Sequence, residues 1–518
     1  AVTLSAADVN TAMASTDATI NGVIVGRGAN SVAGNTSLGD DALDAAVTGD
    51  KNTAVGFEAL TANTSGARNT AVGSESLESN TTGTDNTALG RGTLSNNVST
   101  SFNTAIGKSA LEVNVANNNT AVGHQSLDAN TSGANNTAVG MDAFTANTSG
   151  SNNVAIGHSA ALAATTSIGN VIIGAEAVKT GAFTGYNNVV IGKLAGEDLT
   201  SADANVIIGE DAGKNQTTAD NNVLIGQGAG EATTTGANNV AMGQLALAAN
   251  IGGTTNVAIG RSALTANLSN YNTAVGGNSL TSNTDGADNV AIGHDALKTN
   301  TTVSKNTAVG KAAMELTTTG GENTAIGYSA LYANTTGPYN VAVGRSALSA
   351  NTVGNRNVAV GMQAMGSGIN VGQKNIAIGY QAGLPITSGV RNVIIGDEAG
   401  IAMTTGGTNT IVGTEAGKAI VTTGDNTIVG NEAGKLNTTT LTAFGAFAGH
   451  DHVDGYNNTL IGRYAGREIT NGHSNTVLGH ASLQTATTAV TNTALGMHAL
   501  RLTTTGSDNT AVGHEALD

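Results

Sequence analysis

The sequence contains no cysteine and no tryptophan, and its 518 residues include only two prolines, Pro338 and Pro385. The absence of cysteine excludes a disulfide framework and a thiolate metal site. Proline removes a ladder hydrogen bond from any strand that it enters, so its scarcity fits a body made almost wholly of paired strands. Aromatic residues make up only 3% of the chain. We therefore expect a thin core of small aliphatic side chains.

Positive charge is also scarce, and long apolar runs are missing. The 21 Lys and Arg residues against 37 Asp and Glu residues give a formal net charge of -16 at pH 7, which argues against nucleic acid or an anionic membrane as a partner. No apolar stretch approaches the roughly eighteen residues of a transmembrane helix, so membrane insertion is not expected. The chain opens at Ala1 without methionine, which favours a secreted, extracellular protein whose signal peptide has been removed.

Glycine is abundant, with 71 residues, and much of it marks a repeat. The pattern Asn-Thr-Ala-Val-Gly-x-x-Ala-Leu-x-x-Asn-Thr-Thr-Gly-x-x recurs from about Asn21 onward, and its marker glycine occurs thirty times between Gly26 and Gly513. Almost all steps are seventeen residues long, although only thirteen separate Gly26 from Gly39. A period this short, rich in Thr, Val, Ile and Asn, indicates a stacked β-solenoid, because helical repeats need about thirty residues or more per unit.

The sequence therefore predicts an all-β chain that forms a single long parallel β-solenoid, or β-roll, of about thirty seventeen-residue coils over residues 21–518. Residues 1–20 depart from the repeat and are expected to form an N-terminal cap or docking segment. Within it, the run from Ser5 to Asp8 suits the start of a short capping helix. Each coil is expected to contain two short strands joined by two tight corners.

Coil positions are numbered from the first Asn of the repeat, which puts the marker glycine at position 5. Side chains alternate across a strand, so positions 2 and 4 share one face and positions 1 and 3 share the other. Position 2 is Thr, Val or Ile, position 4 is always apolar, and position 3 is apolar in nearly every coil. Whichever face points inward, an apolar strip runs along the outside, and such strips are rarely left in water. The most economical cover is another copy of the chain in a closed symmetric oligomer.

Position 9 varies together with position 3. Where position 3 is Ala, position 9 is usually Leu, as in Ala54 with Leu60, and where position 3 is large, position 9 is usually Gly, as in Ile207 with Gly213. This exchange roughly conserves volume, as close-packed interiors require. The two positions are therefore expected to touch in one layer, either within a coil or across protomers. The exceptions are Ala377 with Gly383, Ala443 with Gly449 and Val477 with Leu483.

Asparagine occupies position 1 in all but two coils. Identical amides stacked about every 4.7 to 4.9 Å can hydrogen-bond along the stack as a ladder. The glycines at positions 5 and 15 are expected to supply positive φ at the two corners. In the turn from Asn63 to Gly66 and its copies, the Asn is expected to cap its own turn while the Gly takes the left-handed conformation.

Residues with the chemistry of a catalytic or metal site are few. Five histidines stand at position 6, each separated from the next by at least one coil: His124, His158, His294, His480 and His514. His498 lies in the coil between the last two, but at position 7, where strand alternation points it to the other face. We therefore do not expect these histidines to share a metal ion.

The strongest local cluster is His450, Asp451, His452 and Asp454, which has suitable ligand types for a divalent cation. A solvated loop is the commoner explanation of such a run. No carboxylate pair, nucleophile constellation or phosphate loop stands out. We predict no enzymatic activity and assign no catalytic, cofactor-binding or metal-binding residue.

The repeats resemble a known group. Residues 69–73 (Asn-Thr-Ala-Val-Gly) and residues 323–337 (Asn-Thr-Ala-Ile-Gly-Tyr-Ser-Ala-Leu-Tyr-Ala-Asn-Thr-Thr-Gly) are similar to the head repeats of trimeric autotransporter adhesins and to the seventeen-residue arrays of phage-fibre-type proteins. The resemblance covers nearly the whole chain. It implies a parallel β-roll, commonly trimeric, that serves as an extracellular fibre or adhesive head.

The sequence therefore predicts a non-enzymatic extracellular structural protein that self-associates into a fibre or filament through β-solenoid stacking. The sequence stops at Asp518, halfway through a coil, so we expect head-to-tail docking, with residues 1–17 as a possible donor strand. A trimmed chain is the other explanation of that end. The alternative function is an adhesin or phage-type fibre head, a homotrimer that binds a surface or glycan receptor. Scattered tyrosines favour the structural function, and Val115 and Ile251 interrupt the threonine array that ice binding would require.

Overall fold

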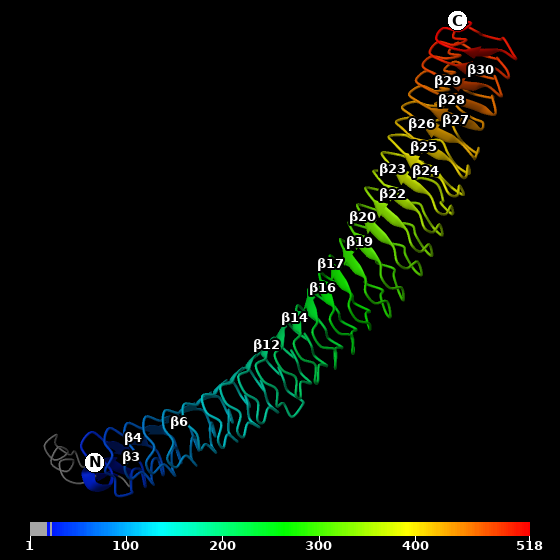
Figure 1. Cartoon of the computed structure of the whole chain (residues 1–518). Coiled ribbons are helices and arrows are strands. Elements are labelled where there is room, and N and C mark those ends of the chain that lie inside the picture. Colours follow the sequence, from blue (N-terminus) through cyan, green and yellow to red (C-terminus); the bar gives the residue numbers. More distant parts are fainter. Residues whose placement is uncertain (1–17, 21–22) are drawn as a thin grey trace. The chain divides into compact units, whose positions relative to one another are not determined.

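The computed structural model describes residues 18–20 and 23–518 (Figure 1). These residues divide into two compact units, the first ending at Asn256 and the second spanning Val257–Asp518. The capping helix expected to start in the run from Ser5 to Asp8 lies outside the described residues. Each unit consists of short strands, one in each coil, that are joined by turns. Each unit is described separately below.

In the first unit, the strands of successive coils pair in parallel, with Thr53 opposite Thr70 and Thr70 opposite Thr87. The ladder contains β3 (Thr36–Leu38), β4 (Thr53–Val55), β5 (Thr70–Val72), β6 (Thr87–Leu89), β7 (Thr104–Ile106), β8 (Thr120–Val122), β9 (Thr137–Val139), β10 (Val154–Ile156), β11 (Val171–Ile173), β12 (Val189–Ile191), β13 (Val206–Ile208), β14 (Val223–Ile225) and β15 (Val240–Met242).

The second unit repeats this arrangement, as in the parallel pairing of Val341 with Val358. Its ladder contains β16 (Val257–Ile259), β17 (Thr273–Val275), β18 (Val290–Ile292), β19 (Thr307–Val309), β20 (Thr324–Ile326), β21 (Val341–Val343), β22 (Val358–Val360), β23 (Ile376–Ile378), β24 (Val393–Ile395), β25 (Thr410–Val412), β26 (Thr427–Val429), β27 (Leu441–Phe444), β28 (Asn458–Ile461), β29 (Thr476–Leu478), β30 (Thr493–Leu495) and β31 (Thr510–Val512). The predicted all-β, parallel β-solenoid is confirmed in both units.

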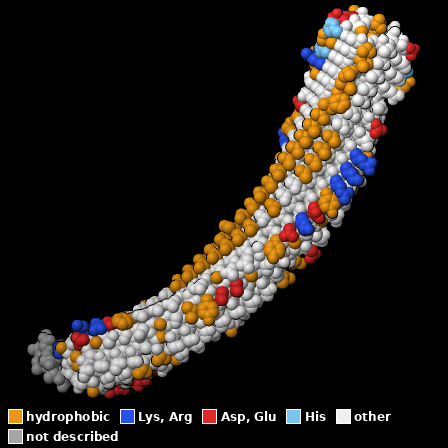
Figure 2. All heavy atoms as spheres, in the orientation of Figure 1, with side chains coloured by type: hydrophobic (Ala, Val, Ile, Leu, Met, Phe, Trp, Pro, Cys, Tyr) orange, Lys and Arg blue, Asp and Glu red, His pale blue; other side chains and the backbone are white. Residues whose placement is uncertain are grey.

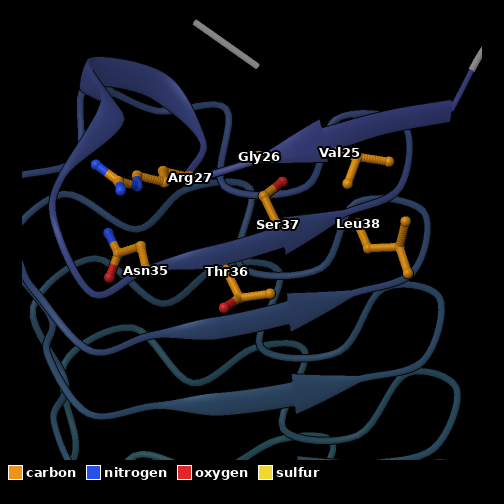
Figure 3. A pocket seen from close by; sticks show the side chains of 7 residues that line it. All are labelled: Val25, Gly26, Arg27, Asn35, Thr36, Ser37 and Leu38. Atoms are coloured by element: carbon orange, nitrogen blue, oxygen red, sulfur yellow. The ribbon is translucent and has the colours of Figure 1, made fainter. Parts of the chain in front are cut away.

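The first strands of the described chain form a hairpin and not a coil. β1 (Ala18–Ile20) pairs antiparallel with β2 (Val23–Gly26), and β2 pairs antiparallel with β3, with Gly26 opposite Ser37 (Figure 3). A single turn of 3-10 helix, η1 (Ala29–Ser31), joins β2 to β3. Counting Gly26 as the marker of a first coil is therefore wrong. The thirteen-residue step to Gly39 is too short for a full turn of the solenoid, so the chain reverses.

The strand residues alternate between the core and the outside. Ala54, Ala71 and Ala88, at position 3, are fully buried, whereas Leu89 and Ile106, at position 4, keep 46% and 36% of their surface exposed. Position 3 thus shares the inward face with the Asn of position 1, and positions 2 and 4 face outward. The predicted grouping of faces is confirmed, and the apolar strip consists of positions 2 and 4.

The expected second strand of each coil is replaced by turns. Gly56, at position 5, has a φ of 135°, and a Cβ atom there would lie 2.5 Å from the carbonyl oxygen of Gly73, so only glycine fits. Glu58 and Leu60 then adopt left-handed φ values of 54° and 53°. The Leu60 amide still donates to the carbonyl of Ser76 in the next coil at 3.0 Å. Hydrogen bonding between coils therefore continues on this side without strand geometry.

At position 15, glycine is favoured where space is short and not because of positive φ, and several coils carry Thr, Ser or Ala at this position. Among the turn residues it is Arg68, at position 17, that has a left-handed φ of 58°. A Cβ atom on Gly66 would lie 2.3 Å from Oδ1 of Asn63 and 2.4 Å from the carbonyl oxygen of Gly83. Asn63 Nδ2 donates to the Gly66 carbonyl at 3.0 Å. The predicted Asn cap is confirmed, and the predicted left-handed glycine at this corner is wrong.

Positions 3 and 9 touch within a single coil, as the volume exchange predicts. A Cβ atom on Gly213 would lie 3.3 Å from Cδ1 of Ile207, and one on Gly466 would lie 2.8 Å from Cδ2 of Leu460. The large residue at position 3 therefore occupies the space that Leu fills at position 9 elsewhere. This contact makes the two positions one layer of the core.

Position 12 belongs to the same layer, which explains one exception to the exchange rule. In the coil of Ala377, a Cβ atom on Gly383 would meet Cδ1 of Ile386 at 2.8 Å and Cδ1 of Ile394 at 3.0 Å. Ile386 stands at position 12, and Ile394 is the position-3 residue of the next coil. Position 12 is most often the asparagine of the turn, so the sequence pattern does not predict that this position is part of the core.

Two ladders of buried asparagine hold the coils in register. At position 1, the Asn69 amide N–H donates to Asn52 Oδ1 at 2.9 Å, and Asn69 Nδ2 donates to the Gly83 carbonyl at 2.8 Å. At position 12, Asn80 Nδ2 donates to Asn63 Oδ1 at 2.9 Å. The predicted ladder is confirmed. It satisfies backbone groups that would be costly to bury without a partner.

The contact between positions 3 and 9 predicts that two damaging substitutions compensate. Leu60→Gly should cost about 3 kcal/mol of unfolding free energy by leaving a cavity, and Ala54→Ile should cost about 1–3 kcal/mol by overpacking. The loss of unfolding free energy in the double variant should be smaller, by at least about 2 kcal/mol, than the sum of the losses in the two single variants. Urea unfolding followed by circular dichroism measures this coupling.

The matched control for this test combines Ala54→Ile with Leu94→Gly, two coils away. Those sites do not share a layer, so their effects should add. Equal coupling in the two double variants would contradict the contact within a coil.

Candidate interaction surface

An apolar strip lies on the outer surface of each unit. It is made of positions 2 and 4 of β3 to β15 in the first unit and of β16 to β31 in the second, and none of these residues is charged. Ile292, Ile326 and Leu478 keep 40%, 42% and 50% of their surface exposed. Figure 2 shows the strip over the strands of the second unit as a row of orange side chains. This surface has one apolar row per coil and no polar interruption at position 4.

The area of the strip is large enough for a stable interface. If each coil contributes on the order of 50 Å² of apolar surface, the strands of the second unit alone present about 800 Å², which is what a standard interface buries on each partner. The outward β-branched residues lie on paired strands, whose backbone is already held in place on both sides. Little ordering is therefore needed before a partner binds.

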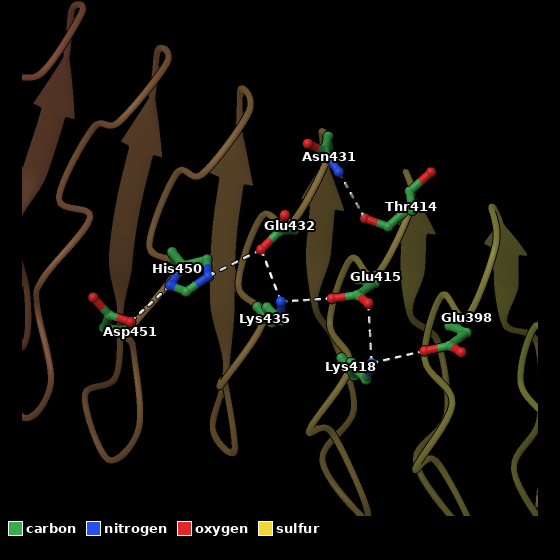
Figure 4. Close-up of polar contacts among 9 residues, drawn as sticks. All are labelled: Glu398, Thr414, Glu415, Lys418, Asn431, Glu432, Lys435, His450 and Asp451. Carbon is green, nitrogen blue, oxygen red and sulfur yellow. Dashed lines mark hydrogen bonds and ion pairs between the residues drawn. The ribbon is translucent and has the colours of Figure 1, made fainter.

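One row of charged residues lies on a different face of the coil, mainly at positions 7 and 10. Each lysine of this row bridges the carboxylates of two neighbouring coils, and at one end of the row His450 lies between Glu432 and Asp451 (Figure 4). Hydrogen bonds from Lys435 and Lys418 lower the pKa of Glu415. The charges of this face thus satisfy one another. The row contains Glu398, Lys418, Glu415, Lys435, Glu432, His450 and Asp451.

The histidine cluster is divided between two sides of its coil. His450, at position 10, lies in the charged row, 3.2 Å from Glu432 Oε2 and 2.6 Å from Asp451 Oδ1. His452, at position 12, is fully buried. Within residues 18–20 and 23–518, no group of three or more His, Cys, Asp or Glu side chains is arranged to hold a metal ion. The structure therefore does not bring His450 and His452 together as metal ligands.

His452 takes the place of a ladder asparagine. Its Nδ1 lies 2.8 Å from Oδ1 of Asn437, and its Nε2 lies 2.9 Å from Nδ2 of Asn458. Asn458 Nδ2 also donates to the carbonyl of Gly472, which fixes the orientation of that amide. The ring is therefore neutral, with its proton on Nδ1. Burial lowers the pKa of His452 to about 4.

The histidines near residue 500 come closer together than strand alternation predicts. The ring of His498 lies 5.6 Å from that of His480 and 6.3 Å from that of His514, between centroids. The prediction that His498 points to another face is wrong, because positions 6 and 7 lie in the turn after the strand. Two further rings continue this row. The ring centroid of Tyr464 lies 6.0 Å from that of His480, and the ring centroid of Phe447 lies 5.3 Å from that of Tyr464.

A comparison with protein-family models finds no match for this chain, and a comparison with curated proteins also finds none. Within the described ranges, no helix has the length and apolarity needed to cross a membrane. The fold and the surface define a β-solenoid repeat protein of the structural, fibrous kind.

The position of His452 predicts acid sensitivity of the surrounding coils. Because its folded pKa of about 4 is below the ordinary 6.5, the unfolded chain binds more protons between these values. Stability that is complete above about pH 6.5 is therefore lost as the pH falls toward 4, by up to about 3 kcal/mol. The variant His452→Asn restores a ladder amide and should lack this loss.

Hydrogen exchange of peptides that span β26 to β28, compared at pH 7.5 and 4.5 and corrected for intrinsic rates, measures the effect. The exposed His480 supplies the control, since His480→Asn should keep the wild-type response. An unchanged acid response in His452→Asn would mean that another group is responsible.

Proposed function

We propose that this chain is a non-enzymatic structural protein of an extracellular fibre, in which copies associate side by side through the apolar strip. The observation that carries this proposal is the uncharged, partly exposed row of positions 2 and 4 in the strands of both units. Such surfaces are rarely left in water. A second copy presents an identical row, which suits a closed symmetric contact.

The charged face supports this mode of association. The ion pairs from Glu398 to His450 occupy positions 7 and 10, so they stay in water when positions 2 and 4 are covered. Burial of the strip therefore leaves the ion pairs of this row in solvent, which avoids one cost of forming an interface. The extracellular location and a trimeric state rest on the resemblance of the repeats to adhesin heads and phage-fibre arrays.

End-to-end stacking is the second proposed mode of association. β2 runs antiparallel to β3, and β1 runs antiparallel to β2. β1 therefore runs in the same direction as the strands of the ladder that begins at β3. A strand of another copy that runs in the same direction as β1 would therefore pair with it in parallel, as the coils of each unit do. The donor-strand segment, residues 1–17, lies outside the described residues and stays a prediction.

An adhesin or phage-type fibre head is the alternative function. In this case the self-associated chains would also bind a surface or receptor. The observation that favours it is a hollow lined by Tyr328 and Tyr332 on the second unit, because aromatic residues are enriched where proteins bind partners.

Charges placed in the strip should abolish lateral association. The variant Val309→Glu, Ile326→Glu and Val343→Glu puts three carboxylates at position 4 of successive coils, where burial without a partner is costly. We expect wild-type oligomers to become single chains, as measured by analytical ultracentrifugation.

The matched control places the same charges at position 14 of the same coils, through Thr319→Glu, Thr336→Glu and Val353→Glu. This control should keep the wild-type mass. A monomeric wild type, or strip variants that still associate side by side, would refute the lateral contact. Electron microscopy separates the two modes, because end-to-end filaments would persist in the strip variant.

A further inference from the structure

We propose that the second unit carries a saccharide-binding site on the face formed by positions 6, 7 and 10. A hollow of about 420 Å³ lies there across three successive coils, within the range of small-molecule sites. The side chains that matter for binding are Lys311, Glu315, Tyr328, Ser329, Tyr332 and Ser346.

Small residues at position 7 create the hollow. Three coils in succession carry Ala312, Ser329 and Ser346 at this position. Further along the same face, position 7 carries the glutamates of the charged row, whose side chains cover the surface (Figure 4). Tyr328, at position 6, and Tyr332, at position 10, line the hollow beside these small residues. Tyr328 is 53% exposed.

The polar groups of the hollow are available to a ligand, unlike those of the charged row. In the described part of the chain, the Glu315 carboxylate and the Lys311 ammonium group form no ion pair, and the hydroxyls of Ser329 and Ser346 form no hydrogen bond. The backbone beneath them is fixed, because the Ser329 amide donates to the Lys311 carbonyl at 3.0 Å and the Ser346 amide donates to the Tyr328 carbonyl at 2.9 Å. The hollow is therefore preformed.

This combination fits a neutral pyranose better than other ligand classes. A pyranose has an apolar C–H face, which packs on a tyrosine ring, and a rim of hydroxyls. The Glu315 carboxylate accepts from two neighbouring hydroxyls, and Lys311 donates to hydroxyl oxygens. A purely apolar ligand would bury both charges without partners. A phosphate would meet the Glu315 carboxylate, and the net charge of -16 would also repel it.

The open form of the hollow favours a unit of a longer glycan chain. Lys311 and Tyr328 are both exposed, so the site has no lid, and a ligand can extend beyond it in both directions. The apolar strip at positions 2 and 4 lies on another face of the same coils. Self-association and saccharide binding can therefore occur together. An assembly of several copies would carry several weak sites, and their simultaneous binding to one glycan surface would raise the overall affinity. This inference goes beyond the fibre function and does not require it.

Titration of the full chain with cellotetraose, chitotetraose and maltotetraose tests the proposal, with saturation-transfer NMR and calorimetry as readouts. At least one of these should bind at concentrations up to about 10 mM. Tyr332→Ala should weaken binding at least tenfold, and Tyr332→Phe, which keeps the ring, should retain most of it. Ser346→Gln introduces the side chain that position 7 carries in the next coil, fills the hollow and should abolish binding.

Tyr380→Ala is the matched control, because Tyr380 is another exposed tyrosine at position 6 but does not line the hollow. It should leave binding unchanged. Failure of all three oligosaccharides to bind would overturn the proposal, as would equal binding by wild type and Tyr332→Ala. Sedimentation of the same variants separates this result from the fibre function, since none of these changes alters the strip.

Discussion

The buried asparagine of position 1 is the constraint on which the rest of each coil depends. Its oxygen accepts the backbone N–H of the next asparagine, and its amide holds the carbonyl of position 15 in its own coil, as Asn69 does for Asn86 and Gly83. A shift by one residue would turn this amide outward and every apolar strand residue to the wrong face. The ladder thus fixes register, and register in turn places the strip, the charged row and the hollow on separate faces.

Strand positions could be predicted from the sequence because their side-chain period is local and simple. The alternation of Ala71 with Thr70 and Val72, and the exchange between positions 3 and 9, both follow from volume and polarity. Turn geometry could not be predicted in the same way. Whether Gly66 or Arg68 takes positive φ depends on contacts with the next coil, which hydrophobic patterning does not record.

The candidate surfaces show the same division. The alternation of the strand residues predicted an apolar strip on the outside, but only the burial of position 3 assigned that strip to positions 2 and 4. The hollow depends on three small residues at position 7 that stand in successive coils. The burial of His452 could not be predicted either, because a histidine within the run from Asp451 to Asp454 is typical of a polar loop. Its burial follows from the ladder position that it occupies, which becomes evident only when coils are superimposed.

The left-handed residues of the turns have a consequence for how the chain folds. Glu58 and Leu60 each hold a conformation that costs an L-residue about 1–2 kcal/mol, and the amide of Leu60 finds its acceptor only in the following coil. An isolated coil is therefore unstable, and a folded coil acts as a template for its neighbour. Folding of such an array proceeds by nucleation and then by addition of one coil at a time. Coils can therefore fold in sequence during synthesis, as each one follows its neighbour out of the ribosome.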